Sequence, residues 1–391
     1  MSSQTRVLVL DHTAELGGAE IALVRLLDAL PPGEFDVTTL LFADGPLVGM
    51  LREHGHRVEV LPLDPDVGSL ARADSASGSG AIRAALRSTP FLGRLTGRVM
   101  RLRPDVIHTT SLKSDLLGMN VAKLTRTPLV WHVHDRISDD YLPARTATLF
   151  RMLARRVPTE LVANSYATAA TLEPIPHLSV AYPGFTPDQL GLAIGINVLP
   201  TPRVVGLLGR ISPTKGQLEF VRAAAEVVPA HQDVEFRIIG SALFGHDDYE
   251  RQVRAEISER GLGGRVRLVG FADDPLAAID QLSLLVHAST TPEPFGQVIV
   301  EAMIRGVPVV ATGAGGAREI LDPVPDGEQL GLLVPPGDVD ALAQAITSVL
   351  DHPEDAAERA ARAWRSAQER FPISRTAEVV SEVWRRAARA R

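Results

Sequence analysis

The 391-residue sequence contains no cysteine, which excludes disulfides and any metal or redox site built on thiolates. It also lacks an uninterrupted apolar run of the roughly 18 residues that a membrane-spanning helix needs. Its start, MSSQTRVLVLDHT, has neither the apolar stretch nor the cleavage site of a secretory signal. A net charge of −7 argues against nucleic acid as a partner. We therefore expect a cytoplasmic protein.

Short apolar runs alternate with amphipathic stretches along the chain, a pattern typical of parallel strands buried on both faces and joined by helices. Strands are predicted in the first half at Arg6–Leu10, Val37–Leu41, Val58–Leu61, Val106–His108, Leu129–His134 and Glu160–Ala163. In the second half they are predicted at Val204–Leu208, Glu235–Ile239, Val266–Leu268, Leu284–His287, Val309–Ala311 and Gly331–Val334. Helices are expected between them, for example at Ala19–Leu30, Gln217–Val228 and Asp248–Arg260.

Residues 183–202 hold four prolines and three glycines and separate the two series. This arrangement predicts an α/β protein with two Rossmann-like, doubly wound domains. Ligands of such sheets bind beyond the carboxyl ends of the strands, so the cleft between two such domains is the default site.

The stretch Glu293-Pro294-Phe295-Gly296 follows an apolar strand and precedes a helix that begins near Gln297. A helix N-terminus with a glycine suits phosphate, because its N–H groups are free and its dipole end is positive. Glu301 lies one turn further along, on the face of Gln297. Glu293 suits a sugar hydroxyl and Glu301 a ribose. The alternative is an acidic helix start with one surface glutamate.

A second strand-end loop carries Gly209, Arg210, Lys215 and Gly216. Two cations in one loop can neutralise a diphosphate and stabilise it as it departs in a transfer reaction. The alternative is a solvated loop with two surface charges.

In the first half, Gly17-Gly18 lies between the first strand and the first helix, where a phosphate-binding turn would lie. The pattern is not Gly-x-Gly-x-x-Gly, and no acidic residue closes the second strand, which argues against a nicotinamide dehydrogenase. His132 and His134 share one face of a strand and precede Asp135. Proton transfer, polar contact, a metal and a buried core histidine are the alternatives for this pair.

Three further patterns have structural alternatives. The glycine-rich loop at 313–319 is either a backbone contact for a ligand or a tight turn. Asp64-Pro65-Asp66 and Asp338-Val339-Asp340 match the Asp-x-Asp pattern of metal-dependent sugar transferases. The first lies in a proline-rich loop and the second starts a helix, so we interpret both as structural and predict no metal site.

Arginines gather in two places. Six lie between Arg83 and Arg103 without an acidic residue, and Arg94, Arg98 and Arg101 among them share one helical face. A second cluster holds Arg145, Arg151, Arg155 and Arg156. The Arg83–Arg103 face suits an anionic partner, either the inner membrane face with a lipid-linked acceptor or a phosphorylated acceptor. The alternative is a solvated basic face.

Taken together, the order and spacing of these motifs resemble the GT-B glycosyltransferases of family 4 over nearly the whole chain. The matching elements are Gly17-Gly18, Trp131–Asp135, Gly209-Arg210, Lys215-Gly216, Gly270-Phe271, the Glu293–Glu301 pair, Gly315-Gly316 with Glu319, and Gly331–Pro335. The resemblance implies a retaining, metal-independent enzyme that needs no cofactor and moves a sugar from a nucleotide-diphosphate donor. A sugar-nucleotide epimerase and a non-catalytic binding protein of the same fold are the alternatives.

The resemblance also implies roles for residues. Arg210 and Lys215 would bind the diphosphate, Glu293 the sugar and Glu301 the ribose, and His134 would lie near the transferred sugar. Further donor contacts would come from Gly17, Gly18, Gly209, Gly270, Phe271, Phe295, Gly296, Gln297 and Val298. Residues 1–185 would form the acceptor domain and 186–370 the donor domain, with a helix at 371–391 returning to the first. Donor base, sugar and acceptor have no side-chain signature in the sequence.

Overall fold

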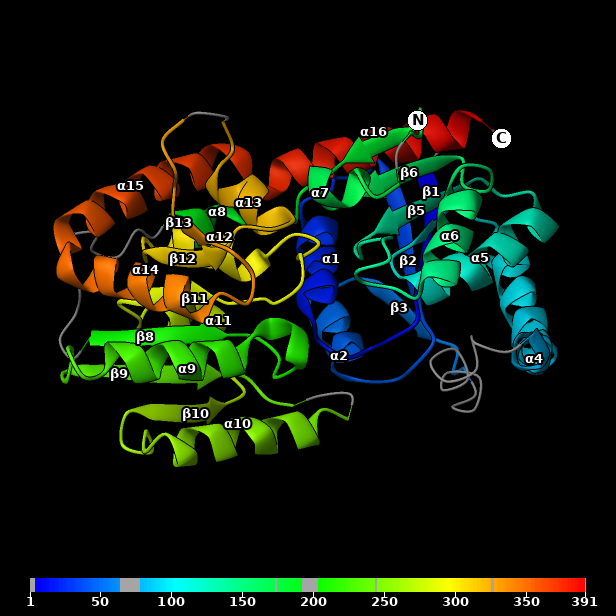
Figure 1. The fold of residues 1–391 in the computed structure, drawn as a ribbon. Helices are drawn as coiled ribbons and strands as arrows, with labels where there is room; N and C mark the ends of the chain where they lie inside the picture. The colour runs from blue at the N-terminus through cyan, green and yellow to red at the C-terminus, as the bar shows by residue number, and fades with distance from the viewer. Residues whose placement is uncertain are drawn as a thin grey trace. The chain divides into compact units, whose positions relative to one another are not determined.

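The computed structural model describes residues 4–63, 78–172, 174–191, 203–242, 245–324 and 327–390 (Figure 1). The chain divides into two compact units. The first unit comprises Met1–Gly184 and Ile373–Arg391, and the second comprises Phe185–Pro372. The last helix, α16 (Ile373–Arg389), therefore belongs with the N-terminal part of the chain.

The first unit is built on a seven-stranded parallel sheet with the order β3-β2-β1-β4-β5-β6-β7. Its strands are β1 (Thr5–Asp11), β2 (Phe35–Leu41), β3 (Arg57–Val60), β4 (Val106–Thr109), β5 (Leu129–Val133), β6 (Glu160–Ala163) and β7 (Leu178–Val180). Every strand predicted in this half is present. β7 was not predicted, because three half-buried residues are too short to show a period.

Side chains of alternate strand residues enter two separate cores, as the period of a strand requires. Val7 and Val9 join the core under α1 (Gly18–Asp28), α2 (Pro46–Glu53) and α16. Leu8 and Leu10 join the core under α4 (Gly78–Leu102), α5 (Leu112–Thr125) and α6 (Ala144–Ala154). The short helix α7 (Tyr166–Ala169) follows β6. Helices thus cover both faces of the sheet, so a ligand can approach it only at the ends of the strands.

Helix α16 is held in the first unit by apolar and polar contacts. Trp384 is fully buried, and its Nε1 donates to Nδ1 of His108 over 3.0 Å. Arg386 pairs with Glu160 at the start of β6. These contacts attach the C-terminal end of the chain to the central strands.

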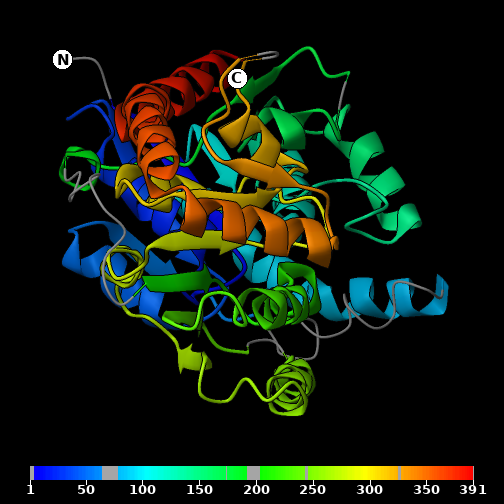
Figure 2. The ribbon, with the colours of Figure 1, turned by 60° about the vertical axis from the view of Figure 1, so that its left-hand side comes forward.

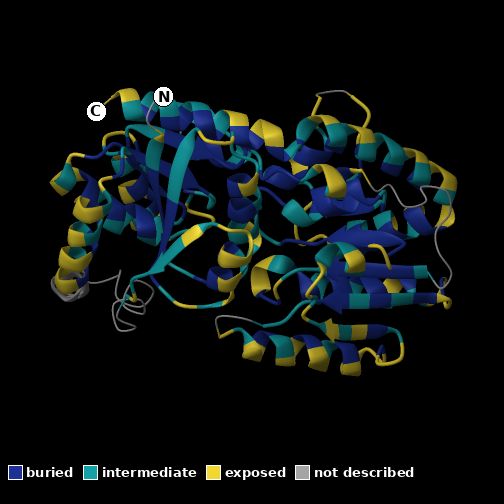
Figure 3. Ribbon diagram, turned by 180° about the vertical axis from the view of Figure 1, so that it is seen from behind, coloured by how far each residue is buried: buried dark blue, intermediate teal, exposed yellow. Residues whose placement is uncertain are grey.

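The second unit repeats the architecture with six parallel strands in the order β10-β9-β8-β11-β12-β13. They are β8 (Arg203–Leu208), β9 (Val234–Ile239), β10 (Val266–Gly270), β11 (Leu284–His287), β12 (Val309–Thr312) and β13 (Leu332–Val334), so each strand predicted here is confirmed. Figure 3 shows strands of both sheets as largely buried.

Helices again supply the outer layers of this unit (Figure 2). One core lies under α9 (Gln217–Val227), α10 (Asp247–Glu259) and α14 (Val339–Asp351). The remaining helices are α8 (Pro187–Leu190), α11 (Pro275–Ile279), α12 (Gln297–Ile304), α13 (Gly316–Leu321), α15 (Pro353–Arg370) and the 3₁₀ turn Pro213–Lys215. Among the described residues, no helix has the length and apolar character needed to cross a membrane.

Each sheet has one point at which the strand order reverses. In the first unit this switch point lies between β1 and β4, and in the second it lies between β8 and β11. The loops that leave such neighbouring strands diverge and open a crevice, which is where ligands bind in open α/β sheets.

Candidate functional site

Two loops pack together at the switch point of the second unit. One follows β8 and contains Lys215 and Gly216, and the other follows β11 and contains Ala288 and Thr290. Gly216 has a φ of 72°, and a Cβ there would lie 1.8 Å from the carbonyl oxygen of Ala288. Thr290 N also donates to Thr214 O over 3.0 Å. Only glycine permits this approach, which brings the two loops into direct contact.

This contact joins the predicted cation to the predicted acid. Lys215 Nζ donates to Glu293 Oε1 over 2.6 Å. Ser289 Oγ donates to the same oxygen over 2.6 Å, and Nε2 of His287 lies 3.6 Å from it. Ser289 and His287 were not predicted from sequence, because they close an apolar strand and carry no motif. Glu293 thus has three partners: Lys215 from the loop after β8, His287 at the end of β11 and Ser289 just beyond it.

The electrostatics of this cluster favour an ionised Glu293. Burial opposes the charge, but the Lys215 ammonium and the contact with His287 hold the pKa of Glu293 well below its ordinary value. Its side chain keeps 13% exposure and that of Lys215 keeps 28%. The pair is therefore shielded, yet both groups can still reach a ligand. Of the two cations in the loop after β8, Lys215 is paired and partly buried and does not match the alternative of a solvated surface charge, whereas Arg210 is exposed.

Arg210 lies in the same loop on a fixed backbone. Buried Gln217 donates from Nε2 to Arg210 O over 3.0 Å and accepts from Ser212 N at 3.4 Å. Arg210 itself is exposed, and Gly209 precedes it with a φ of 152°. A rigid backbone thus presents a guanidinium at the carboxyl edge of the sheet.

The glycine-rich loop after β12 supports the Glu293 loop. A Cβ on Gly315 would lie 2.3 Å from Glu293 O, and one on Gly316 would lie 2.2 Å from Phe295 O. Gly316 N donates to Glu293 O over 2.9 Å. Phe295 is buried against Phe371, with ring centroids 5.8 Å apart. These glycines allow two backbones to meet, and Phe295 can offer a ligand only its main chain.

Helix α12 begins directly after this loop. Gly296 is its N-cap, with a φ of 104°, and Gln297 and Val298 open the first turn, whose N–H groups lack partners within the helix. Gln297 Nε2 donates to Glu301 Oε1 over 2.9 Å. Glu301 is only 6% exposed, so the alternative of a surface glutamate is wrong. At the end of β10, Gly270 has a φ of 91° and Phe271 exposes 63% of its surface.

In the first unit, the rings of three histidines on β4 and β5 and directly after β5 lie next to one another. The ring centroids of His132 and His134 are 4.1 Å apart, and those of His108 and His132 are 5.3 Å apart. Burial lowers the pKa of His108 to about 3 and that of His134 to about 4, and it lowers the pKa of His132 as well. The rings are therefore neutral near pH 7. Of the predicted pair, His132 is 6% exposed and matches the buried alternative.

A small cavity lies beside these rings. His132 and His134 line it together with Ala19, Leu23, Thr110 and Pro183. No group of three or more side chains that could hold a metal occurs among the residues the structure describes. Asp338 caps α14 by accepting from Ala341 N over 2.9 Å, as its structural interpretation predicts. Asp64 and Asp66 lie outside the described residues.

The turn at Gly17-Gly18 opens α1, and Gly17 is its N-cap. The carboxyl group of Glu20 folds back and accepts from the backbone N–H of Gly17. Burial, and then the nearby Asp11, raise the pKa of Glu20 to about 7. Sequence reasoning did not single out Glu20, which holds the predicted phosphate-binding turn in place.

Two arginines of the predicted face on α4 already contact other residues of the first unit. Arg98 pairs with Glu59 on β3, and Arg94 donates to Pro62 O over 2.9 Å. Leu95 and Val99 are buried in the core of the first unit. Arg101 and Arg103 are exposed, but the side chains of Arg83 and Arg87 lie outside the described residues.

Comparison with known proteins finds one family match in each unit. The "Glycosyl transferase 4-like domain" matches residues 17–175, and "Glycosyl transferases group 1" matches residues 195–367. The second match includes both loops at the switch point of the second unit.

Individual relatives cover most of the chain. The lipopolysaccharide core biosynthesis mannosyltransferase LpcC of Rhizobium leguminosarum bv. viciae is 27% identical over 292 residues, which are 73% of this chain and 79% of the relative. A phosphatidyl-myo-inositol mannosyltransferase of Mycobacterium leprae is 28% identical over 316 residues, or 78% and 81%. The crystal structure of Anabaena HepE with UDP and glucose matches with a TM-score of 0.79 and 30% identity, covering 97% of this chain and 99% of that one.

Proposed function

The chain belongs to the group 1 glycosyltransferases of family 4, which share the GT-B fold, and we propose that it transfers sugar with retained anomeric configuration and without a metal ion. It is a glycosyltransferase that uses a nucleotide-sugar donor. The observation that carries the finer proposal is the cluster of Lys215, Glu293 and Ser289 at the switch point of the second unit.

The proposed donor site uses both the cation and the carboxylate of this cluster. Arg210 and Lys215 bind the diphosphate, whose negative charge grows as the sugar leaves. The N–H groups that open α12 bind phosphate oxygens, Glu293 accepts from a sugar hydroxyl, and Glu301 accepts from the ribose. Two side-chain cations thus supply the charge that a divalent metal supplies elsewhere, which supports metal independence.

Retention is proposed on a front-face attack, in which the departing phosphate takes the proton of the acceptor hydroxyl. Glu293 is held in an ion pair and serves to position the sugar. His134, a neutral imidazole, acts by polar contact near the transferred sugar. No covalent nucleophile is required for this route.

A uridine nucleotide is the proposed donor. HepE, at 30% identity, was crystallised with UDP and with UDP-glucose. We expect UDP-glucose to raise the unfolding temperature more than GDP-, ADP- or dTDP-glucose. A ligand at a hundredfold excess over its dissociation constant adds about 2.7 kcal/mol of stability, which a thermal-shift screen detects. A larger shift with another base would reassign the donor.

For the first unit we propose acceptor binding and a peripheral contact with anionic lipid through the Arg83–Arg103 face. Exposed Arg101 and Arg103 flank Leu102, and Met100 exposes 64% of its surface, the combination that binds a charged membrane surface. Co-sedimentation should be stronger with anionic than with neutral vesicles and should weaken in Arg101→Glu/Arg103→Glu. Equal binding to both vesicle types would remove the membrane contact.

Donor turnover tests the activity itself. With UDP-glucose and an acceptor, nuclear magnetic resonance should show release of UDP and a new glycoside that retains the α configuration. An inverted product would exclude retention, and epimerised donor without an acceptor would favour the epimerase. Binding without turnover would leave only a nucleotide-sugar-binding role. Unchanged activity after chelation is the result expected for metal independence.

A further inference from the structure

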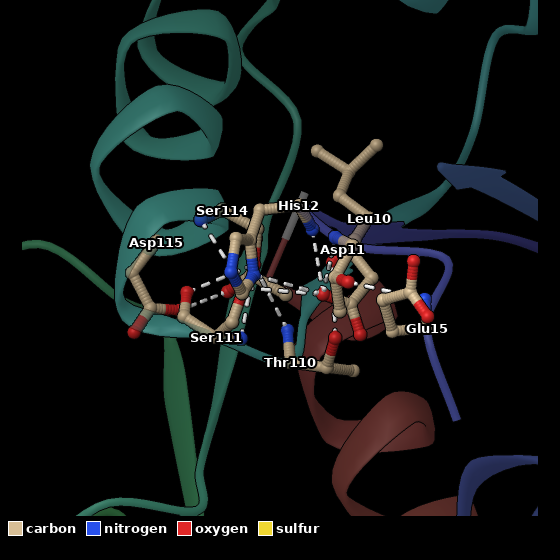
Figure 4. Close-up of polar contacts among 10 residues, drawn as sticks. Leu10, Asp11, His12, Glu15, Thr110, Ser111, Ser114 and Asp115 are labelled. Carbon is tan, nitrogen blue, oxygen red and sulfur yellow. Dashed lines mark hydrogen bonds and ion pairs between the residues drawn. The ribbon is translucent and has the colours of Figure 1, made fainter. Parts of the chain in front are cut away.

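Three polar residues converge at the switch point of the first unit (Figure 4). Asp11 ends β1 and is 2% exposed, His12 follows it, and Ser111 leaves the neighbouring strand β4 as the N-cap of α5. His12 Nδ1 lies 2.8 Å from Ser111 Oγ and 3.2 Å from Asp11 Oδ1. Ser111 Oγ lies 3.3 Å from the same carboxyl oxygen. The three groups form a closed set of hydrogen bonds.

These contacts assign the proton of the His12 ring. Asp11 Oδ1 accepts a hydrogen bond from the backbone N–H of His12 over 2.6 Å. A carboxylate oxygen has only lone pairs to offer, so Oδ1 also presents lone pairs to Nδ1 of the ring. A lone pair on Nδ1 would be repelled by those of Asp11 Oδ1. In its neutral form the ring therefore carries its proton on Nδ1. Nε2 is left as a hydrogen-bond acceptor. Within the described residues Nε2 makes no hydrogen bond and is not buried, and the side chain keeps 30% exposure.

The backbone around this set is fixed from both strands. Thr110 N and Oγ1 both lie 3.2 Å from Leu10 O, which ties the start of the Ser111 loop to β1. Ser114 Oγ lies 2.9 Å from Ser111 Oγ and accepts from Thr110 N over 3.2 Å. The imidazole is thus held in one orientation before any ligand binds, a property of binding groups that act by position.

We propose that His12 binds the acceptor: its Nε2 accepts a hydrogen bond from a hydroxyl that neighbours the attacking one, and Asp11 and Ser111 are positioning residues. The inference rests on the proposed function and deepens it. In the second unit the proposed donor groups occupy the switch point, and His12 occupies the equivalent point of the first. The attacking hydroxyl must turn a lone pair toward the sugar and keep its own proton for the departing phosphate, and a fixed contact at the neighbouring hydroxyl sets that orientation.

The charges nearby indicate the chemical class of the acceptor. The Asp11 carboxylate lies 3.2 Å from the His12 ring, and its charge helps to raise the pKa values of Glu20 and buried Asp115. The histidines behind them are neutral. This edge therefore favours an acceptor that is uncharged or amine-bearing near the reacting hydroxyl, and it disfavours a phosphate there.

The test compares the wild type with His12→Phe, His12→Gln and Asp11→Ala. The donor is UDP-glucose, and the acceptors are methyl glycosides with their 6-phosphates as matched anionic probes. His12→Phe should lower kcat/KM for the acceptor about tenfold, the value of one hydrogen bond, mainly through KM. Donor hydrolysis by water and the donor-induced thermal shift should stay within about twofold. His12→Gln, which can accept at the place of Nε2, should recover part of the loss.

Asp11→Ala supplies a readout that a merely structural role would not move. It removes the carboxylate to which both Nδ1–H and Ser111 Oγ donate, so the Ser111 hydroxyl is free to donate to Nδ1 instead. That change favours the proton on Nε2, which removes the acceptor while the ring remains. Nitrogen-15 spectra of the histidine rings should show the Nδ1–H form of His12 in the wild type and the Nε2–H form in Asp11→Ala. The transfer loss should match that of His12→Phe.

Three results would overturn the inference alone: unchanged acceptor kcat/KM in His12→Phe, an equal fall in donor hydrolysis, or an Nε2–H form in the wild type. Preference for the 6-phosphates would overturn the assigned acceptor class. A wild type that binds UDP-glucose but transfers to no probe would overturn the proposed function and the inference with it.

Discussion

Lys215 and Glu293 form an ion pair that joins the loop after β8 to the loop after β11, with 2.6 Å between Nζ and Oε1. The pair is 78 residues apart in sequence and depends on Gly216, which lets the two loops touch. It fixes the ammonium and the carboxylate before a donor arrives. A site assembled in advance loses little free energy to reorganisation when charge develops during transfer.

Lys215→Ala should reduce transfer by about a hundredfold or more, because loss of one fixed charge contact to a developing anion has that effect on kcat. Steady-state rates with saturating UDP-glucose measure it. Lys123→Ala is the matched control, since Lys123 is an exposed lysine on α5. The control should retain wild-type rates. Near-normal turnover in Lys215→Ala would remove Lys215 from the donor site.

Glu293→Gln should change the dependence of stability on pH. The pKa of Glu293 is lowered in the fold, so its ionised form adds stability above the ordinary value of roughly 4.5, and this contribution is lost as pH falls through the folded pKa. The wild type should unfold at a higher temperature than the variant at pH 7, and the difference between the two should shrink as pH falls below the ordinary value. Parallel curves over the whole range would contradict the buried ion pair.

Glu20→Gln should act in the opposite direction. The pKa of Glu20 is raised to about 7 in the fold, so the folded state holds a proton that the unfolded state releases from roughly pH 4.5 upward. Stability of the wild type therefore falls as pH rises from 4.5 to 7, and the variant should lack this component and exceed the wild type at pH 8. Glu15→Gln, at an exposed position nearby, is the control. A variant less stable than the wild type at pH 8 would refute the assignment.

Trp384→Phe should destabilise the first unit. The change deletes buried volume and leaves Nδ1 of His108 without its donor, so a loss of about 2 kcal/mol is expected in urea unfolding. Trp364→Phe on α15 is the matched control, because Trp364 Nε1 has no hydrogen-bond partner among the described residues. Equal losses in the two variants would show that the His108 contact contributes nothing.

Much of the fold could be predicted from the sequence because parallel strands buried on both faces are continuous apolar runs. β8 and β11 are such runs, and the loops after them carried the motifs. β7 was not predicted, because three half-buried residues are too few to show the alternation of a strand. The sequence shows the order of the strands along the chain but not their order within each sheet. The two switch points depend on the order within the sheet, so they could not be predicted.

Residues of the candidate site could be predicted only where a single loop combines charged side chains and glycines in a recognisable motif. Lys215, Glu293 and Glu301 could be named, but how far each side chain is buried could not be predicted, and a solvated surface position was the alternative for their loops. Ser289 and His287 have no motif. His12 and Ser111 are 99 residues apart and meet because β1 pairs with β4. Such contacts depend on strand pairing, which local sequence does not specify.

The central claim is that the Lys215–Glu293 cluster holds a nucleotide sugar for retaining transfer. The most direct measurement is the release of UDP and the anomeric configuration of the product, followed in the wild type and Lys215→Ala with UDP-glucose and a methyl glycoside. The account predicts an α-linked product from the wild type and at least a hundredfold slower release from the variant. A β-linked product, or equal rates from both proteins, would contradict it.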